Sequence, residues 1–416
     1  MYDISDRLVI RLPICQKSKR IHMLIKRVIT DRLLSAAQEY PVVSIVGPRQ
    51  SGKTTLAQTC FPDHRYISLE DYDIRLLANV DPRKFLTDFP SLSGIILDEI
   101  QHAPQLLSYI QTIVDREKKN GFFIVTGSQN LLVDQAITQT LAGRMAVLTL
   151  LPLSLAELSD AGMITETIET LIYKGSYPQA HAQKVSIERL YSNYLRLYVE
   201  RDVRQIKNVT DLAIFQKFMR LCAGRVGQIL NLTSLGNDCG INHHTAQAWI
   251  SLLEASYVIF LLNPYFNNFS KRLIKSPKLY FIDTGIICSL LKIGSAQELL
   301  SHYLRGGLIE SFIIADFLKQ QHNLEQQPSL YFWRDQTGNE LDCVIDKSPY
   351  AVPIEIKGSN TIATDFFKGL QYWKKLTENT STPGYVVYCG DENQSWPQAK
   401  VLSWKSIGNF IQDIST

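Results

Sequence analysis

The stretch at residues 44–55 constrains this chain more than any other, because it reads Ser-Ile-Val-Gly-Pro-Arg-Gln-Ser-Gly-Lys-Thr-Thr. It matches the pattern G-x-x-x-x-G-K-[ST], which needs a strand before it and a helix after it. The run at residues 41–46 is rich in β-branched residues and predicts that strand, and residues 56–58 continue as a helix. The stretch therefore predicts a phosphate-binding loop in an α/β fold; the alternative is a strand–helix turn that matches by accident.

Each part of this loop has a physical role in holding phosphates. Its backbone N–H groups form a concave nest at a helix N-terminus, where partial positive charge favours the α- and β-phosphates. Gly52 lets the main chain approach them closely, Lys53 is expected to reach the β- and γ-phosphates, and the Thr54 hydroxyl to complete a Mg²⁺ shell. The nucleotide-binding residues predicted in this way are Gly47, Pro48, Arg49, Gln50, Ser51, Gly52, Lys53, Thr54 and Thr55.

An acidic pair follows a later apolar run, Gly-Ile-Ile-Leu-Asp-Glu at residues 94–99. The pattern is typical of a buried parallel strand, whose carboxyl end is the edge where ligands bind in open α/β sheets. We expect Asp98 to hold the Mg²⁺ through water and Glu99 to polarise the attacking water. The alternative is a pair that only caps a helix.

A further strand is predicted at residues 121–128, and it ends in Thr-Gly-Ser. A polar side chain at its end would lie between the two acids and the γ-phosphate. Ser128 is the first candidate for a residue that senses this phosphate and Asn130 the second. Either could instead cap the next helix. A fifth strand is expected from Met145, directly after Leu-Ala-Gly-Arg.

The order of P-loop, Leu-Asp-Glu-Ile-Gln, Thr-Gly-Ser, Leu-Ala-Gly-Arg and Leu-Pro-Leu-Ser-Leu-Ala-Glu resembles predicted AAA-type ATPases of bacteria and archaea. In that family a C-terminal domain of unknown function 4143, similar to PD-(D/E)XK nucleases, follows the P-loop domain. The resemblance covers nearly all of residues 23–416 and implies ATP and Mg²⁺ as ligands. It also implies that Arg144 acts as a finger on a neighbour's nucleotide, and therefore a homo-oligomer; the alternative is an arginine paired with a surface acid. No residue of the lid can be singled out as a second sensor, because Arg189, Arg196 and Arg201 all fit.

The middle of the chain changes character twice. Residues 153–214 are mostly helical, and the spacing of Tyr191, Tyr194 and Tyr198 predicts core packing rather than a base-stacking surface. Residues 232–262 and 278–282 predict two short helices and two strands, which resemble a winged helix. If this segment binds DNA, the start of its second helix would face the groove and a wing at 267–275 would meet phosphates; a protein contact is equally open. The residues concerned are Asn242, His243, His244, Thr245, Gln247, Lys271, Arg272 and Lys275.

The last part carries a second group of charged residues. Alternation along the predicted strands puts Glu340 and Asp342 on one face, with Leu341 and Cys343 on the other, and by the same rule Glu355 and Lys357 share a face. Two carboxylates that hold Mg²⁺, with a lysine beside them, are what a metal-dependent phosphodiesterase requires. The resemblance to PD-(D/E)XK nucleases implies the set Glu310, Asp342, Glu355 and Lys357, with Gln371 as an auxiliary residue. The alternatives are a solvated ion pair, or a nuclease scaffold that has lost its chemistry.

Composition adds limits rather than a function. A chain of 416 residues should hold several domains, and a net charge of +3 does not by itself indicate a nucleic-acid partner. The seven scattered cysteines predict reduced thiols and a cytoplasmic protein. We find no run of eighteen apolar residues and expect no membrane span.

These observations combine into an α/β architecture and two hypotheses for function. We expect a basic extension at residues 1–22 (with Met23 as a possible natural start), an AAA core at 23–155 and a helical lid at 156–215. A winged-helix-like segment at 216–295 and a restriction-endonuclease-like α/β domain at 300–416 complete the chain. The first hypothesis is an ATPase coupled to DNA binding or to metal-dependent DNA processing. The alternative is a nucleotide-driven switch whose C-terminal domains bind a protein partner without nuclease activity.

Overall fold

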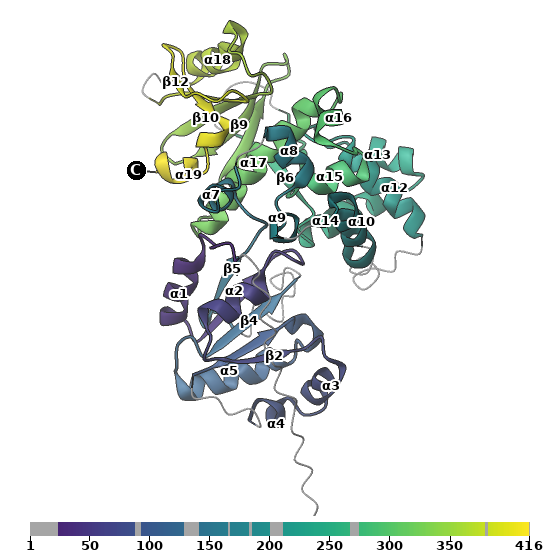
Figure 1. The fold of residues 1–416 in the computed structure, drawn as a ribbon, viewed down its shortest axis with the longest axis vertical. Coiled ribbons are helices and arrows are strands. Elements are labelled where there is room, and N and C mark those ends of the chain that lie inside the picture. Colours follow the sequence, from purple (N-terminus) through teal and green to yellow (C-terminus); the bar gives the residue numbers. More distant parts are fainter. Residues whose placement is uncertain are drawn as a thin grey trace, which may run out of the picture.

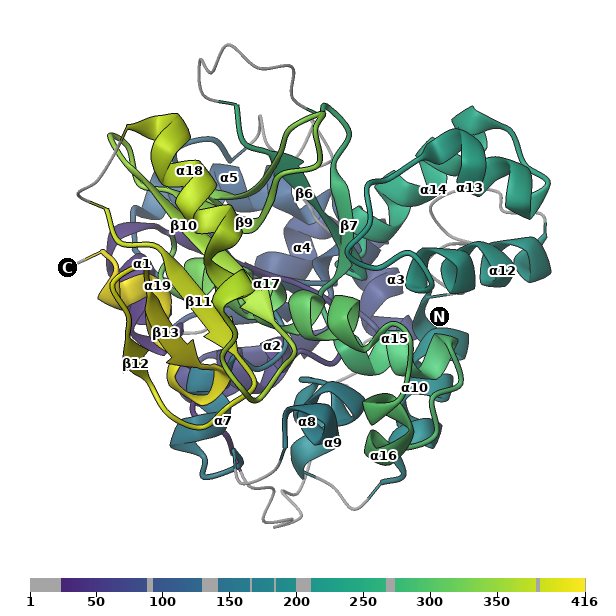
Figure 2. The same ribbon diagram turned by 90° about the horizontal axis from the view of Figure 1, so that it is seen from above.

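The computed structural model describes residues 24–87, 93–128, 141–164, 167–182, 185–199, 211–266, 274–378 and 382–415. The chain forms two bodies of structure, which meet near the end of the first β-sheet (Figure 1). The lower body contains that sheet and the P-loop. The upper body contains a group of helices beside a second, larger sheet (Figure 2).

The first sheet has five parallel strands in the order β2-β3-β4-β1-β5. These are β1 (Val42–Val46), β2 (Arg65–Ser68), β3 (Ile95–Asp98), β4 (Phe123–Gly127) and β5 (Met145–Thr149). The predicted parallel α/β core is therefore confirmed. Because β4 lies between β1 and β3, the P-loop and the acidic pair are separated at the carboxyl edge by the end of β4. This order places Ser128 between them.

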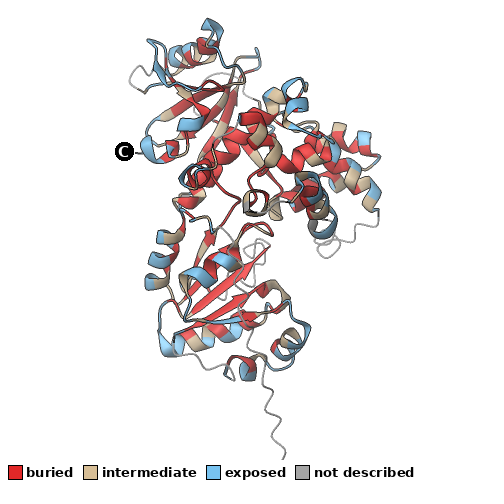
Figure 3. Ribbon diagram, viewed as in Figure 1, coloured by how far each residue is buried: buried red, intermediate tan, exposed pale blue. Residues whose placement is uncertain are grey.

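Helices cover both faces of this sheet. They are α1 (Thr30–Glu39), α2 (Lys53–Cys60), α3 (Tyr72–Val80), α4 (Pro82–Thr87) and α5 (Leu106–Glu117), with a 3₁₀ turn, η1 (Ile100–His102), after β3. One apolar cluster joins the sheet to α1 and α2, and another joins it to α3, α4 and α5. The inner strands β1, β3 and β4 are buried while the outer faces of the helices are exposed, as expected for a parallel sheet (Figure 3).

Apolar residues recur at helical spacing from Leu24 to Ala37 and predict a helix over that whole stretch. In the structure, α1 begins only at Thr30. Residues 24–29 lie along the P-loop instead, where Arg27 and Val28 bond to the side chain of Glu157. These long-range contacts override the local helical pattern.

The segment predicted as a lid is helical in its described part. It contains α7 (Leu155–Asp160), α8 (Ile168–Lys174), α9 (Pro178–Ala182), α10 (Ile187–Tyr194) and one π-helical turn, η3 (Leu195–Val199). Tyr191 and Tyr194 are almost fully buried, which confirms that they pack in the core. The side chain of Tyr198 and all of Arg201 lie outside the described residues.

The predicted helices of the winged-helix segment are present as α13 (Leu232–Cys239) and α14 (His243–Ala255), after α12 (Leu212–Ala223). Strands β6 (Ile259–Pro264) and β7 (Lys278–Phe281) pair antiparallel. However, β6 also pairs in parallel with β8 (Leu330–Arg334), so the hairpin extends the C-terminal sheet. The wing residues Lys271 and Arg272 lie outside the described residues.

The second sheet has eight strands in the order β12-β13-β11-β10-β9-β8-β6-β7. Its further strands are β9 (Glu340–Asp346), β10 (Ala351–Lys357), β11 (Tyr385–Tyr388), β12 (Gln394–Ser395) and β13 (Lys400–Ser403). Helix α17 (Arg305–Asn323) shares one apolar cluster with the sheet, and α18 (Lys368–Thr377) shares another. The remaining helices of the upper body are α15 (Thr284–Leu290), α16 (Ala296–Leu300) and α19 (Phe410–Asp413), with two short 3₁₀ turns. The expected C-terminal α/β segment is therefore present. Within the described residues, no helix is both long and apolar enough to cross a membrane.

Candidate functional site

The P-loop has a backbone shape that only glycine permits at two points. Gly47 has φ +145°, and a Cβ placed on it would lie 2.2 Å from the carbonyl oxygen of Leu150. Gly52 precedes the first residue of α2 with φ +99°, a left-handed conformation. The chain therefore turns sharply out of β1 and points the first N–H groups of α2 into the loop.

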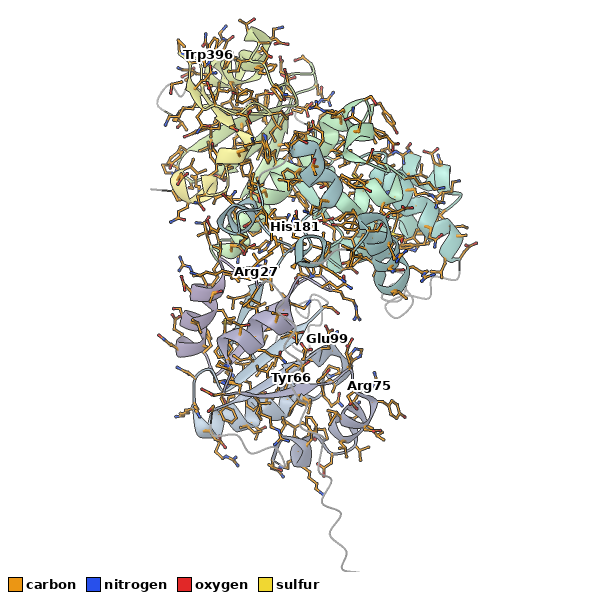
Figure 4. All side chains as sticks on the ribbon, in the orientation of Figure 1. Arg27, Tyr66, Arg75, Glu99, His181 and Trp396 are labelled. Atoms are coloured by element: carbon orange, nitrogen blue, oxygen red, sulfur yellow. The ribbon has the colours of Figure 1, made fainter. Side chains whose placement is uncertain are left out.

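Lys53 and Arg27 brace this loop from inside. The Lys53 ammonium group donates to the carbonyl oxygens of Gly47 at 3.0 Å and Pro48 at 2.7 Å. The buried Arg27 guanidinium donates to the Ser51 carbonyl at 2.7 Å, and also reaches Leu151 and Glu157. Figure 4 shows Arg27 where the lower body meets the upper one. Arg27 thus ties the P-loop to the start of the helical segment.

Asp98 ends β3 beside the P-loop and accepts hydrogen bonds from three hydroxyls. The Thr54 hydroxyl donates to Oδ1 over 2.8 Å and the Tyr66 hydroxyl to Oδ2 over 2.9 Å. Thr126, on β4, also donates to Oδ1. The Thr54 hydroxyl and the Asp98 carboxylate therefore converge, as the predicted Mg²⁺ ligands must.

Glu99 stands in a left-handed conformation, with φ 58°. Its N–H donates to the Thr126 hydroxyl at 3.2 Å, and its carboxylate accepts from the Gln101 amide. The same amide nitrogen donates to the Ser128 hydroxyl at 3.0 Å. Gln101 therefore links the predicted water-polarising residue to the predicted sensor. Asn130 lies outside the described residues.

A cavity of about 640 Å³ opens over the P-loop, a volume suited to a small organic ligand. Lys53, Thr54 and Glu99 line its phosphate end. Its other walls come from segments far apart in sequence, the residues before α1 and the start of α9. These wall residues are Leu24, Ile25, Lys26, Arg27, Pro178 and Gln179.

Arg144 does not approach this cavity in its own chain. It directly precedes β5, at the end of the sheet opposite the P-loop. Its guanidinium pairs with both oxygens of Asp115, at 2.5 and 3.1 Å, and both side chains are partly exposed. Within one chain, Arg144 therefore forms a surface ion pair, which is the alternative to an arginine finger that the sequence analysis left open. Contact with a neighbour's nucleotide stays a prediction.

The second group of predicted residues comes together at one face of the C-terminal sheet. Glu310 comes from α17, Asp342 from β9, and Glu355 and Lys357 from β10. The Lys357 ammonium pairs with Glu355 and lies 3.7 Å from Asp342. The N–H of Ile356 donates to Asp342 at 2.7 Å. Gln371 is exposed on α18.

Two residues that sequence reasoning missed complete this cluster. The Lys278 ammonium lies 3.0 Å from Glu310 and 2.5 Å from Glu340, and the Tyr280 hydroxyl also donates to Glu310. Both residues come from β7, in another predicted domain, and no local pattern links them to Glu310. The side chains Glu310, Glu340, Asp342, Glu355, Lys278, Tyr280 and Lys357 are called the C-terminal cluster below.

Burial dominates the electrostatics of the C-terminal cluster. Loss of water and the neighbouring Asp342 charge raise the pKa of Glu310 to about 7, although Lys278 opposes the shift. The same two causes raise the pKa of Glu355 to about 8. Acids that share a buried site protonate more readily than acids in water. Among the described residues, no group of three or more His, Cys, Asp or Glu side chains is arranged to hold a metal ion.

The predicted DNA-facing residues lie at the start of α14. Asn242 caps the helix by accepting from the N–H of Thr245 at 2.8 Å. His243 and His244 are exposed in its first turn, and Gln247 and Lys275 are exposed as well. This exposure fits a docking role and equally fits solvated cap residues.

The parallel sheet, the P-loop and the acid-ended β3 together form the fold of the P-loop nucleoside triphosphatases. Comparison with protein families shows which domains the chain contains. Residues 39–159 match the AAA domain, and residues 305–407 match a domain of unknown function, DUF4143. Residues 165–297 match a further domain of unknown function, DUF8612. The chain thus contains an AAA domain with a P-loop, followed by a C-terminal DUF4143 domain.

Its relatives do not add an activity. The chain is 29% identical over 336 residues to the uncharacterized protein Rv2008c of Mycobacterium tuberculosis, covering 79% of this chain and 73% of that protein. An uncharacterized protein of Haemophilus influenzae is 22% identical over 271 residues, which cover 58% of this chain and 67% of that protein. A Walker-type ATPase of Pyrococcus abyssi, PABY2304, superposes with a TM-score of 0.43 at 15% sequence identity. The superposition covers 64% of this chain and 96% of that protein.

Proposed function

We propose that this chain hydrolyses ATP with Mg²⁺ at the P-loop and couples hydrolysis to DNA processing by its C-terminal domain. The observation that carries the first half is the 2.8 Å hydrogen bond between Thr54 and Asp98. It puts a hydroxyl and a carboxylate, the ligand types that Mg²⁺ takes beside bound phosphates, next to Lys53. The bound ion would neutralise charge on the phosphates.

The roles of the chain's own residues follow from their places. Lys53 and the loop amides hold the phosphates, Glu99 orients the attacking water, and Ser128 contacts the γ-phosphate through its hydroxyl. Arg144 points away from its own cavity, so it would act on the nucleotide of a neighbouring copy in a homo-oligomer. We place this assembly in the cytoplasm.

The DNA half of the proposal is supported by the C-terminal cluster and by the exposed start of α14. Asp342 and Glu355 lie on neighbouring strands and both lie beside Lys357, and two carboxylates with a lysine are the residue types that a metal-dependent phosphodiesterase uses. The test is nicking of plasmid DNA with Mg²⁺ or Mn²⁺ by the wild type, Asp342→Ala and Glu355→Ala. We expect nicking to disappear in both variants while ATP turnover stays. Equal background nicking in all three proteins would rule the nuclease out.

One observation favours a second function, a nucleotide-driven switch that binds a protein partner. The acids of the C-terminal cluster already have cationic partners in this chain, including Lys278, Lys357 and Arg334. ATP turnover measured with and without duplex or single-stranded DNA separates the two functions. Stimulation by DNA supports DNA processing. Turnover that ignores DNA supports the switch.

A further inference from the structure

Lys278 is the most enclosed cation of the C-terminal cluster. Its side chain is 4% exposed, whereas that of Lys357 is 29% exposed. The ammonium lies 3.0 Å from one oxygen of Glu310 and 2.5 Å from one oxygen of Glu340. The ring of Phe332, with its centre 5.5 Å from the ammonium nitrogen, covers it from another side.

The Glu310 oxygen that meets Lys278 is fully used. It accepts from the Lys278 ammonium and from the Tyr280 hydroxyl, which comes from the same strand, β7. Gly227 packs near the other oxygen, since a Cβ on this glycine would lie 3.4 Å from it. A metal ion that needs Glu310 therefore competes with a tethered ammonium that already holds this carboxylate.

We propose that Lys278 is a built-in counter-ion that weakens the binding of a divalent metal at the C-terminal cluster, because the ion has to displace Lys278 from Glu310. The inference rests on the proposed metal site but does not require DNA cleavage. An ammonium group carries one charge on a fixed stem, whereas a divalent ion demands several oxygen ligands at once. The ion cannot take Glu310 while Lys278 stays in place.

The position of Lys278 in the chain would let the helical domain control metal binding at the C-terminal cluster. It lies within residues 165–297, matched by DUF8612, whereas the acids lie within residues 305–407. The β7 strand is held by β6 and by the loop before α13, where the N–H of Gly227 donates to Leu279 at 2.8 Å. A shift of this hairpin against α17 would withdraw Lys278 and leave Lys357, which belongs to the nuclease-like pattern, in place.

The experiment measures Mn²⁺ binding to the full-length protein, without nucleotide, by calorimetry and electron paramagnetic resonance. Binding that disappears on adding Asp342→Asn is assigned to the C-terminal cluster. We expect Lys278→Met to bind Mn²⁺ at this site at least tenfold more tightly than the wild type. The matched variant Lys405→Met removes an equal charge from an exposed ion pair with Asp391 but leaves Lys278 on Glu310, so its affinity should change less than threefold.

Two results would overturn the proposal. One is unchanged or weaker Mn²⁺ binding in Lys278→Met, and the other is an equal gain in both lysine variants, which would indicate charge alone. The wild type gives a second measurement if Lys278→Met fails to fold. Amine labelling of Lys278, read by mass spectrometry, should rise as saturating Mn²⁺ displaces it; labelling that stays flat counts against displacement. If the protein turns out to have no nuclease activity, the Mn²⁺ binding and labelling measurements still test the role of Lys278.

Discussion

The chain holds carboxylates beside two candidate metal sites, and it stabilises them in different ways. At the P-loop, the oxygens of Asp98 accept from the hydroxyls of Thr54, Thr126 and Tyr66. A hydroxyl is neutral and can turn to share its oxygen with an arriving cation. Under the proposed function, a metal that comes with a nucleotide would meet a carboxylate whose partners can stay beside it.

The C-terminal cluster uses ammonium groups instead. Lys278 pairs with Glu310 and Glu340, and Lys357 pairs with Glu355. An ammonium has three donors and no acceptor, so it can never become a metal ligand and must be displaced or bypassed. The contrast teaches that a similar set of acids can be open to a metal in one place and already neutralised in another.

The largest effect that tests this comparison is expected from Glu99→Gln. The amide keeps the shape of the P-loop site but cannot polarise water, so ATP turnover should fall by roughly 10²–10⁴-fold while nucleotide binding stays. The measurement is phosphate release together with binding of a fluorescent ATP analogue. Glu117→Gln, on the exposed face of α5, is the matched control and should turn over ATP like the wild type. Normal ATP turnover in Glu99→Gln would show that Glu99 does not activate the attacking water at the P-loop site.

The next effect is on stability. Arg27→Ala leaves the fully buried Glu157 carboxylate without its cationic partner, and also frees the carbonyl groups of Ser51 and Leu151. Breaking a buried pair in this way should cost about 3–5 kcal/mol of unfolding free energy. Urea unfolding followed by circular dichroism measures it. Arg116→Ala, which breaks an exposed pair with Glu117, should change the value by less than about 1 kcal/mol. A similar loss of unfolding free energy in both variants would show that burial does not determine how much the Arg27–Glu157 pair stabilises the fold.

A smaller effect should appear in the pH dependence of stability. The pKa of Glu355 is raised from 4.5 to about 8 in the folded protein, chiefly by burial. The folded state therefore holds a proton that the unfolded state releases above pH 4.5. The stability this supplies is fully present below that pH and is lost as the pH rises toward 8. Glu355→Gln, which stays neutral, should flatten the decline by about 1–3 kcal/mol.

Unfolding curves at pH 5, 6, 7 and 8 for the wild type and Glu355→Gln measure this slope. Glu392→Gln, at an exposed loop position, is the control and should keep the wild-type slope. The same change in stability from pH 5 to pH 8 in the wild type and in Glu355→Gln would contradict the prediction. It would mean that Lys357 keeps Glu355 ionised throughout, so that this residue adds no pH dependence in that range.

The smallest effect is expected from Tyr66→Phe. It removes one of the hydroxyls on Asp98 but leaves those of Thr54 and Thr126, so the cost should be about 0.5–1.5 kcal/mol. ATP turnover should therefore stay within about tenfold of the wild type. Tyr109→Phe, on the exposed side of α5, is the control. A collapse of turnover in Tyr66→Phe alone would show that the hydroxyls are not interchangeable, and would narrow the contrast between the two sites.

The P-loop site could be predicted in detail because its signals are local. Gly47, Gly52 and Lys53 lie in one short motif, and Asp98 and Glu99 end one apolar strand. Periodicity also predicted the strand positions and the common face of Glu355 and Lys357 on β10, where the structure shows them paired. These features depend on neighbours in sequence, which a single chain displays directly.

The missed residues have partners far away along the chain. Arg27 meets Glu157 across 130 positions, and Lys278 meets Glu310 across 32. Tyr66 also reaches the site from a strand that carries no motif, whereas Gln101 ends the motif Leu-Asp-Glu-Ile-Gln but had no predicted role. Such contacts are decided by how strands and helices pack, and this information is absent from local spacing. The late start of α1 has the same origin, because contacts to Glu157 outweigh the helical pattern.

The pairing of β6 with β8 also determines how the chain can be divided. A fragment beginning near residue 300 would keep β8 but lose its neighbour, together with the hydrogen bond from Tyr265 to Phe332 at 2.7 Å. One side of β8 would then present unpaired backbone groups to water, and exposed strand edges of this kind recruit other chains. The C-terminal domain on its own should therefore self-associate or precipitate, whereas a fragment that begins before α12 should remain monodisperse.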